Sequence, residues 1–416
     1  MVFLKLIPMI FYNIVSLLLQ PVFWVVMIII WFQFKRLAKM KSSMFNLPEE
    51  SIIVPTIVAS LYGLLGGFIG SIILVIVGLS ILEIGIQYLW ILAVGLMLIN
   101  QRFMCFAYAG GILSLCKYFF GFPEISIPQI MGLVAILHLV EAILILMSGH
   151  LGAVPVYVKD KTGKLVGGFS LQKFWPLPIV AMIAMAIPES NAVTDVIKMP
   201  EWWPLIKSEL VIESENMVYL MMPVIAGLGY GDIALTGHAK QKSLRSAFHL
   251  AVYSVILLIL AIIATNFYSL SILAALFAPL GHEFIIYLGR RHEFKSEPKY
   301  VDTERGIMIL DLLNNSPLKR AGLGTGDVIL SLNENEVNGY SELEYFLQFT
   351  ESNFQITYFS DKKKKIHKTL VKRKGFEASL GLIPVPRGYN DSYLDLSNSD
   401  GFFQKSFTKV LKRIIK

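Results

Sequence analysis

The sequence is poor in charged residues. Only 16% of its 416 residues are Asp, Glu, Lys or Arg, whereas 55% are hydrophobic. A soluble globular domain carries about 25% charged residues, so this composition excludes an ordinary soluble enzyme. Several apolar runs reach the roughly 20 residues that a helix needs to cross a bilayer. The sequence therefore predicts an α-helical polytopic membrane domain.

Cysteine is also scarce. The two cysteines, Cys105 and Cys116, lie in one apolar segment. On a helix they would be about 16 Å apart, too far for a disulfide, so we interpret both as residues of the membrane core. A signal peptide is not expected either, because the apolar run after Lys5 has no small-residue cleavage site.

Hydropathy delimits nine candidate spans. We expect Pro21 to kink the first of them. The segment 176–188 is short and bounded by prolines, so a re-entrant or interfacial position is the alternative for it. The nine spans cover approximately residues 9–34, 55–79, 82–100, 102–120, 128–148, 176–188, 216–236, 247–264 and 266–289.

Basic residues alternate between the predicted loops. They gather at 35–41, at Arg102, at 159–173, at 240–245 and at 290–291. Because Lys and Arg in short loops stay cytoplasmic, nine spans with a cytoplasmic C-terminal domain fit this distribution. One of these cytoplasmic loops, 154–169, alternates like a β-hairpin with a glycine-containing turn.

Signatures of intramembrane catalysis are incomplete. His282-Glu283 begins a His-Glu-x-x-His zinc motif, but position 286 is an isoleucine. Gly229-Tyr230-Gly231-Asp232 resembles the Gly-x-Gly-Asp motif of intramembrane aspartyl proteases, yet no predicted span supplies the second aspartate that this chemistry requires. We therefore predict no catalytic residue, no cofactor and no enzymatic activity.

Three intramembrane polar residues stand out: His138, Glu141 and Asp232. Ionisable groups at this depth are costly and are functional candidates. His138 and Glu141 are three residues apart, a spacing that some metal-binding helices use. No second such motif accompanies them, so we expect His138 to hydrogen-bond Glu141 or a neighbouring helix, and we predict no metal site.

Composition changes near Arg290, which divides the chain into a transmembrane domain, 1–290, and a more polar C-terminal part. There, Ser316-Pro317 leads to Ala321-Gly322-Leu323, and Gly326-Asp327-Val328-Ile329 follows as a turn and strand. A helix over 341–349 with a Ser341–Glu344 capping box and two further strands, 354–359 and 365–372, complete the pattern. Residues 295–386 closely resemble a bacterial PDZ domain, a small α+β fold.

The PDZ resemblance implies a groove in which a peptide adds as a strand beside the helix. The loop 304–308 lacks the second glycine of the family's carboxylate-binding loop, and Leu380-Gly381-Leu382-Ile383 is similar but stands at the end of the domain. An internal peptide or a partner surface is therefore the alternative to a free carboxylate. The residues expected in the groove are Arg305, Gly306, Ile307, Met308, Ile309, Leu343, Phe346 and Leu347.

The chain continues with a polar linker, 387–401, and a basic amphipathic helix, 402–416. Such a helix suits an anionic inner leaflet; docking on the PDZ domain or on a partner is the alternative. The residues expected to contact the membrane surface are Lys405, Lys409, Lys412 and Arg413.

Several spans followed by a cytoplasmic PDZ domain resemble the MinJ-type proteins of Gram-positive rods. This resemblance implies a multi-pass scaffold of the cell membrane, enriched at the septum and poles, that helps to place the division site. Its implied partners are membrane lipids and DivIVA-like and MinD-like division proteins, without nucleic acid, and homo-oligomers are compatible with it. The alternatives are an intramembrane protease regulator and a PDZ-containing sensor or transporter.

Overall fold

The structure is a computed structural model of the chain. It describes residues 2–160, 162–187, 196–207, 216–350, 352–373, 380–388 and 393–394. The predicted basic helix, with Lys405, Lys409, Lys412 and Arg413, lies outside the described residues, as does most of the predicted linker.

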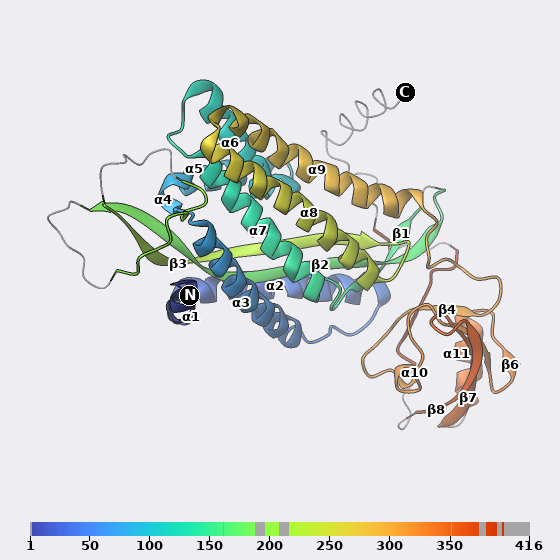
Figure 1. Ribbon diagram of the computed structural model, residues 1–416. Helices are drawn as coiled ribbons and strands as arrows, with labels where there is room; N and C mark the ends of the chain where they lie inside the picture. Colours follow the sequence, from blue (N-terminus) through green and yellow to red (C-terminus); the bar gives the residue numbers. More distant parts are fainter. Residues whose placement is uncertain are drawn as a thin grey trace.

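A bundle of helices forms the N-terminal part (Figure 1). Five of its helices, α2, α3, α7, α8 and α9, are long and apolar enough to cross a membrane. The bundle contains α1 (Val2–Leu18), α2 (Pro21–Phe45), α3 (Ile53–Val77), α4 (Ile81–Ile84), α5 (Ile86–Ile99), η1 (Gln101–Met104), α6 (Phe106–Phe120), α7 (Ile127–Ser148), α8 (Ala239–Asn266), η2 (Tyr268–Leu270) and α9 (Ser271–Lys295). The predicted count of nine spans is thus not confirmed.

A long β-hairpin crosses this bundle in place of two predicted helical spans (Figure 1). Strand β2 (Leu165–Ile187) pairs, from Phe169 to its end, with the whole of β3 (Asn216–Ala234). The prediction of helices at 176–188 and 216–236 is therefore wrong. Prolines in β2 and glycines in β3 disfavour a helix, and pairing of the two strands satisfies backbone groups that apolar surroundings would leave without partners.

The edge of β2 lies directly against α3. Val180 N donates to Ser71 Oγ at 2.8 Å, and Ala184 N donates to Ser80 Oγ at 3.1 Å. Pro176 and Pro178, earlier on the same edge, have no N–H to satisfy. Their carbonyls lie so close to Gly63 and Gly67 of α3 that a Cβ at either glycine would overlap them. The helix therefore covers this strand edge at close range.

Helices α5 and α6 form a hairpin that enters the bundle and returns to the same end. At that end, Ser126 N donates to Glu83 O at 2.9 Å. At the tip, Cys105 lies beside His138 and His282, which are near the middles of α7 and α9. The two predicted spans 82–100 and 102–120 are thus two short arms, of 14 and 15 helical residues, that reach only part of the way.

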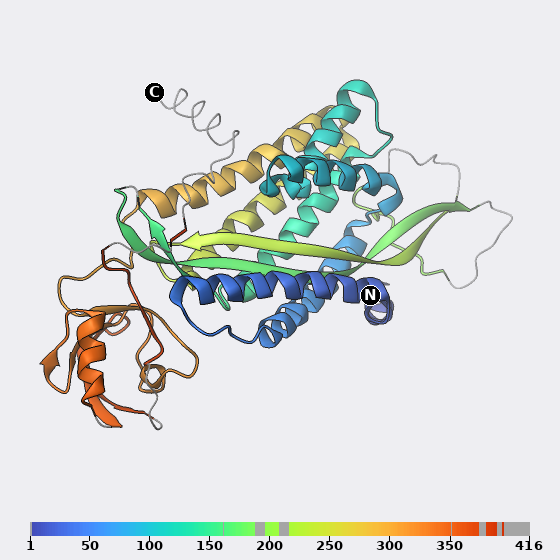
Figure 2. The same cartoon turned by 180° about the vertical axis from the view of Figure 1, so that it is seen from behind.

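Two separate helices replace the first predicted span, 9–34. α1 ends at Leu18, and Pro21 is the first residue of α2, so the chain breaks where a kink was predicted. Proline is well tolerated at a first helical position but not within a helix. Figure 2 shows α2 lying along the β-hairpin, with which it is in contact.

The predicted hairpin at 154–169 is confirmed by β1 (Val154–Lys159), which pairs with the start of β2. Its turn is organised by Asp160, whose Oδ1 accepts hydrogen bonds from Thr162 N and Lys164 N. These bonds hold the pKa of Asp160 below its usual value although partial burial raises it. We call this hairpin and the neighbouring ends of α2, α8 and α9 the base.

The C-terminal domain packs next to the base. Its sheet has the strand order β8-β7-β5-β4-β9, with β6 paired to β5. Its elements are β4 (Ile307–Leu312), α10 (Pro317–Arg320), β5 (Val328–Leu332), β6 (Asn335–Glu336), α11 (Tyr340–Gln348), β7 (Asn353–Ser360), β8 (Lys365–Lys372) and β9 (Leu382–Pro384). The helix starts differently from the prediction, because Gly339 is the N-cap and Glu342 accepts from Asn338 N in place of the Ser341–Glu344 box.

The close approach of α3 and β2 can be tested with Gly67→Ala. The added Cβ would overlap the Pro178 carbonyl, so we expect a loss of about 1–3 kcal/mol of stability, typical of overpacking. The matched control is Gly95→Ala on α5, where a Cβ meets nothing within 4 Å. Thermal unfolding of the purified chain in detergent compares the two. Equal melting temperatures would contradict the packing described.

Candidate functional site

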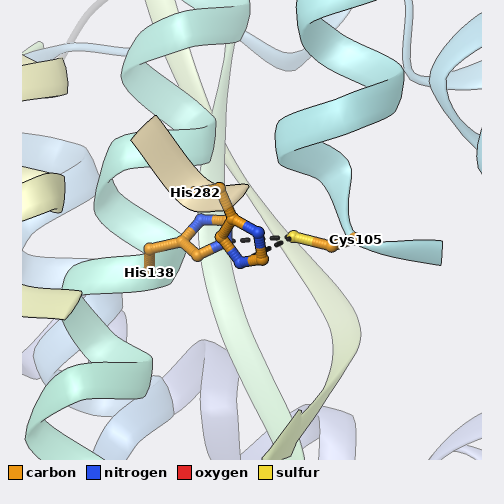
Figure 3. Close-up of side chains that lie close together, drawn as sticks. All are labelled: Cys105, His138 and His282. Carbon is orange, nitrogen blue, oxygen red and sulfur yellow. Dashed lines mark hydrogen bonds between the residues drawn. The ribbon is translucent and has the colours of Figure 1, made fainter. Parts of the chain in front are cut away.

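A partly buried cluster joins three polar side chains from separate parts of the bundle (Figure 3). Cys105 precedes α6, His138 lies on α7 and His282 on α9. Cys105 Sγ is 3.1 Å from His138 Nε2 and 3.6 Å from His282 Nε2. Of the three, sequence reasoning kept only His138 as a candidate: His282 was considered as the start of an incomplete His-Glu-x-x-His motif, and Cys105 as a residue of the membrane core. Residues so far apart in the chain carry no shared spacing that would join them into one site.

Hydrogen bonds orient both imidazole rings. His138 Nδ1 lies 2.7 Å from the Val134 carbonyl, one turn back on its own helix. His282 Nδ1 lies 3.4 Å from the Tyr108 hydroxyl, which donates to Glu283 Oε2 at 2.8 Å. Each Nδ1 therefore faces a hydrogen-bond acceptor, and each Nε2 points at the cysteine sulfur.

Arg102 takes part in this network. Its Nη2 is 2.6 Å from Glu283 Oε2 and 2.7 Å from Glu283 Oε1, and both side chains are largely buried. The sequence placed Arg102 in a cytoplasmic loop, which is wrong, because the α5–α6 hairpin carries it to the middle of α9. A buried ion pair compensates the cost of bringing either charge into apolar surroundings.

Glu141 does not bond with His138. In the described part of the chain this carboxyl group has no hydrogen-bond or ion-pair partner, but it interacts electrostatically with Cys105 and Tyr253. It is thus a further ionisable group near the cysteine–histidine cluster.

Asp232 lies near the base, on β3 and away from the cluster. Its Oδ2 accepts a hydrogen bond from Ser246 Oγ at 2.7 Å and forms an ion pair with Lys242 Nζ at 3.1 Å. Lys242 is buried, and its ammonium also lies 4.0 Å from Glu293. Asp232 therefore acts here as the counter-charge of a buried lysine.

In the C-terminal domain, the strand predicted to bind a peptide has no free edge. On one side of β4, Ile307 and Met308 pair with β5; on the other side, Ile309 and Leu312 pair with β9. The prediction that Arg305, Gly306, Ile307, Met308 and Ile309 form the groove is therefore corrected. Within the described residues, β9 is the outer strand next to β4, with β8 at the other edge of the sheet. It begins at Leu382, inside the Leu380–Ile383 stretch that resembles a carboxylate-binding loop.

The helix contributes less to an open groove than predicted. Leu343 and Leu347 of α11 are buried in the domain core together with Leu382. Phe346 is only partly buried and packs against that core. Of the three predicted helix residues, Phe346 alone is partly exposed and so able to contact a ligand.

One end of β9 is covered by the base. Val385 N donates to Met308 O, so the backbone carbonyl of the preceding residue, Pro384, points away from β4. Pro384 has no N–H, and its carbonyl accepts a hydrogen bond from the Tyr157 hydroxyl of β1 at 2.9 Å. The Tyr157 hydroxyl therefore lies against the Pro384 end of β9.

Asp361 fastens the C-terminal domain to the base. Its carboxylate accepts hydrogen bonds from Lys299 Nζ at 2.6 Å and Lys364 Nζ at 2.8 Å, and lies 3.2 Å from His238 Nε2. Burial raises the pKa of Asp361, but these lysines outweigh it and lower the pKa to about 2. The backbone adds two contacts to this junction, Gly167 N to Tyr300 O and Lys299 N to Leu235 O, both at 2.8 Å.

Together these features define a protein with helices able to cross a membrane and a β-rich C-terminal domain. No protein-family model matches the chain. The chain is 22% identical over 222 residues to cell division topological determinant MinJ of Bacillus subtilis strain 168, which is 53% of this chain and 52% of that protein. The match thus spans about half the length of each protein, and it confirms the resemblance to MinJ-type proteins.

A solved structure aligns with part of the chain. The PDZ domain of an SdrC-like protein from Listeria monocytogenes shares 16% identity, covers 20% of this chain and 90% of that domain, and gives a TM-score of 0.17.

The Asp361 junction predicts a dependence on pH. Its carboxylate pKa lies below the ordinary value of 3.8, so its contribution to docking is complete above that value and is lost as pH falls towards 2. At neutral pH, Asp361→Asn should weaken docking by about 1 kcal/mol or less, because the pair is partly exposed. The measurement is the rate of tryptic cleavage after Lys299, which should be higher in Asp361→Asn than in the wild-type chain.

Asp302→Asn is the control for that experiment. Asp302 pairs with Arg387 at 2.7 Å and is exposed, and this pair does not reach the base. Cleavage that is equally fast in both variants would contradict a docking role of Asp361.

Proposed function

We propose that the chain is a multi-pass membrane scaffold that recruits cytoplasmic division proteins through its PDZ-like domain, at the septum and poles. The observation that carries this proposal is the docked arrangement, in which the PDZ-like domain is hydrogen-bonded to the base of the membrane bundle. The partial likeness to MinJ supports the division role. DivIVA-like and MinD-like proteins and membrane lipids are the proposed partners.

The base is the proposed cytoplasmic face. Basic residues gather there, as expected for the cytoplasmic side, while Arg102 is accounted for by its ion pair with Glu283. With the β-hairpin as two crossing strands, the chain still ends on the cytoplasmic side. The basic residues of the base are Lys35, Arg36, Lys39, Lys41, Lys159, Lys164, Lys240, Lys242, Arg245, Arg290 and Arg291.

The proposed peptide site lies between β9 and α11. A peptide that adds to β9 gains backbone hydrogen bonds, but it meets Tyr157 at the Pro384 end. Partner binding is therefore proposed to compete with docking of the domain on the base.

An intramembrane protease regulator is the second candidate. The PDZ resemblance favours it, since PDZ domains accompany membrane proteases. The Gly-x-Gly-Asp motif would serve only a catalytic version, and Asp232 lies in a strand and is paired with Lys242. Shared protonation by two aspartates, which that chemistry requires, is incompatible with a permanent lysine partner. We therefore propose that the chain is not an enzyme.

A C-terminal fluorescent fusion that matures only in the cytoplasm tests the proposed function. Imaged in dividing cells of the source organism, the full chain should gather at septa and poles. A fusion that ends at residue 295 should stay in the membrane and fail to retain the MinD-like protein. An even peripheral signal from the full chain would argue against division-site placement and favour the regulator.

Competition at the groove predicts the effect of Tyr157→Phe. The substitution removes the hydrogen bond to Pro384 O, which is worth about 1 kcal/mol. Affinity for a PDZ-dependent partner should therefore rise by up to about 5-fold. Binding of the purified chain to the organism's MinD-like and DivIVA-like proteins measures it. Tyr12→Phe, at an exposed position on α1, is the control and should change nothing.

A further inference from the structure

The cysteine–histidine cluster contains more hydrogen-bond acceptors than donors, so hydrogen bonds alone do not explain it. Because each Nδ1 faces an oxygen acceptor, the proton of each neutral ring belongs on Nδ1, and each Nε2 presents a lone pair. Tyr108 is free to accept at its oxygen, since its hydrogen goes to Glu283. The thiol of Cys105 has one hydrogen, which can satisfy only one of the two Nε2 atoms.

The spacing of the three atoms fits a shared cation. Their ligand atoms all lie within 4.8 Å of one another. In a tetrahedral zinc site, bonds of about 2.3 Å to sulfur and about 2.0–2.1 Å to nitrogen place the two ligand atoms about 3.5 Å apart. The observed sulfur–nitrogen separations are 3.1 and 3.6 Å, so only small side-chain adjustments are needed.

The surroundings resemble those of built metal sites. Ligating histidines in proteins donate their second N–H to a carbonyl or to a carboxylate network. His138 meets the Val134 carbonyl, and His282 meets Tyr108, which is bonded to Glu283. Tyr253 packs edge-on against both rings, at centroid distances of 5.5 and 5.8 Å. This ring thus packs against both imidazoles of the cluster.

The cluster can offset part of the charge of a divalent cation. A metal-bound cysteine is a thiolate, so the site would place one negative charge and two neutral imidazoles around the ion.

We propose that Cys105, His138 and His282 bind one transition-metal ion of the zinc class. Thiolate and imidazole ligands suit zinc and copper, and exclude the oxygen-preferring magnesium and calcium. The ion would tie the tip of the α5–α6 hairpin to α7 and α9, which are otherwise joined there by side-chain packing and the Arg102–Glu283 pair. Its role is structural in this proposal.

The test uses the full chain, purified in detergent, loaded separately with zinc or with copper(I) and then freed of excess metal. Elemental analysis should find about one bound ion per chain. Cys105→Ala and His282→Gln should each abolish retention. Cys116→Ala removes a cysteine that lies eleven residues further along α6, and should retain the full amount.

Cobalt(II) loading of the wild-type chain provides a second readout that needs no variant to fold. A site with one thiolate should give a sulfur-to-cobalt charge-transfer band and the visible bands of tetrahedral cobalt. Retention of zinc or of copper that depends on Cys105 supports the proposal. A wild-type chain that retains neither metal and shows no charge-transfer band overturns it, and so does equal retention in Cys105→Ala.

Discussion

The structure depends on how an open strand edge is accommodated inside an apolar bundle. An unpaired N–H or C=O in such surroundings costs several kcal/mol. Along the edge of β2 that faces α3, two prolines have no N–H, and the hydroxyls of Ser71 and Ser80 accept the N–H groups of Val180 and Ala184. Gly63 and Gly67 permit the helix to approach closely enough to cover the edge.

The position of the β2–β3 hairpin determines where the other parts of the molecule pack. Because β2 runs along α3 and continues past it, its start pairs with β1 and forms the base on which the C-terminal domain docks. The same contacts bring Tyr157 to β9. At the other side of the bundle, α7 and α9 receive the tip of the α5–α6 hairpin, and the polar residues collect there.

Much of this protein could be predicted from local patterns. In the C-terminal domain, the predicted helix 341–349 and the predicted strands 354–359 and 365–372 lie within a residue or two of α11, β7 and β8, whereas β6 and β9 were not predicted as strands. The Asp160 hairpin was also predicted, since turn chemistry is local. Hydropathy predicted helices at 176–188 and 216–236 where the structure has strands, because an apolar run of this length is compatible with a buried strand as well as with a helix.

The sequence by itself determined that the chain has helices apolar enough to cross a membrane and a C-terminal part whose motifs resemble those of a PDZ domain, since composition and short motifs need no knowledge of neighbours. Only the tertiary structure decided which strand of that domain is outermost, that Asp232 serves as the partner of Lys242, and that Cys105 meets two histidines more than 30 and 170 residues away. These outcomes depend on which segments pack together, and a single sequence carries no periodic or spaced signal for such long-range contacts.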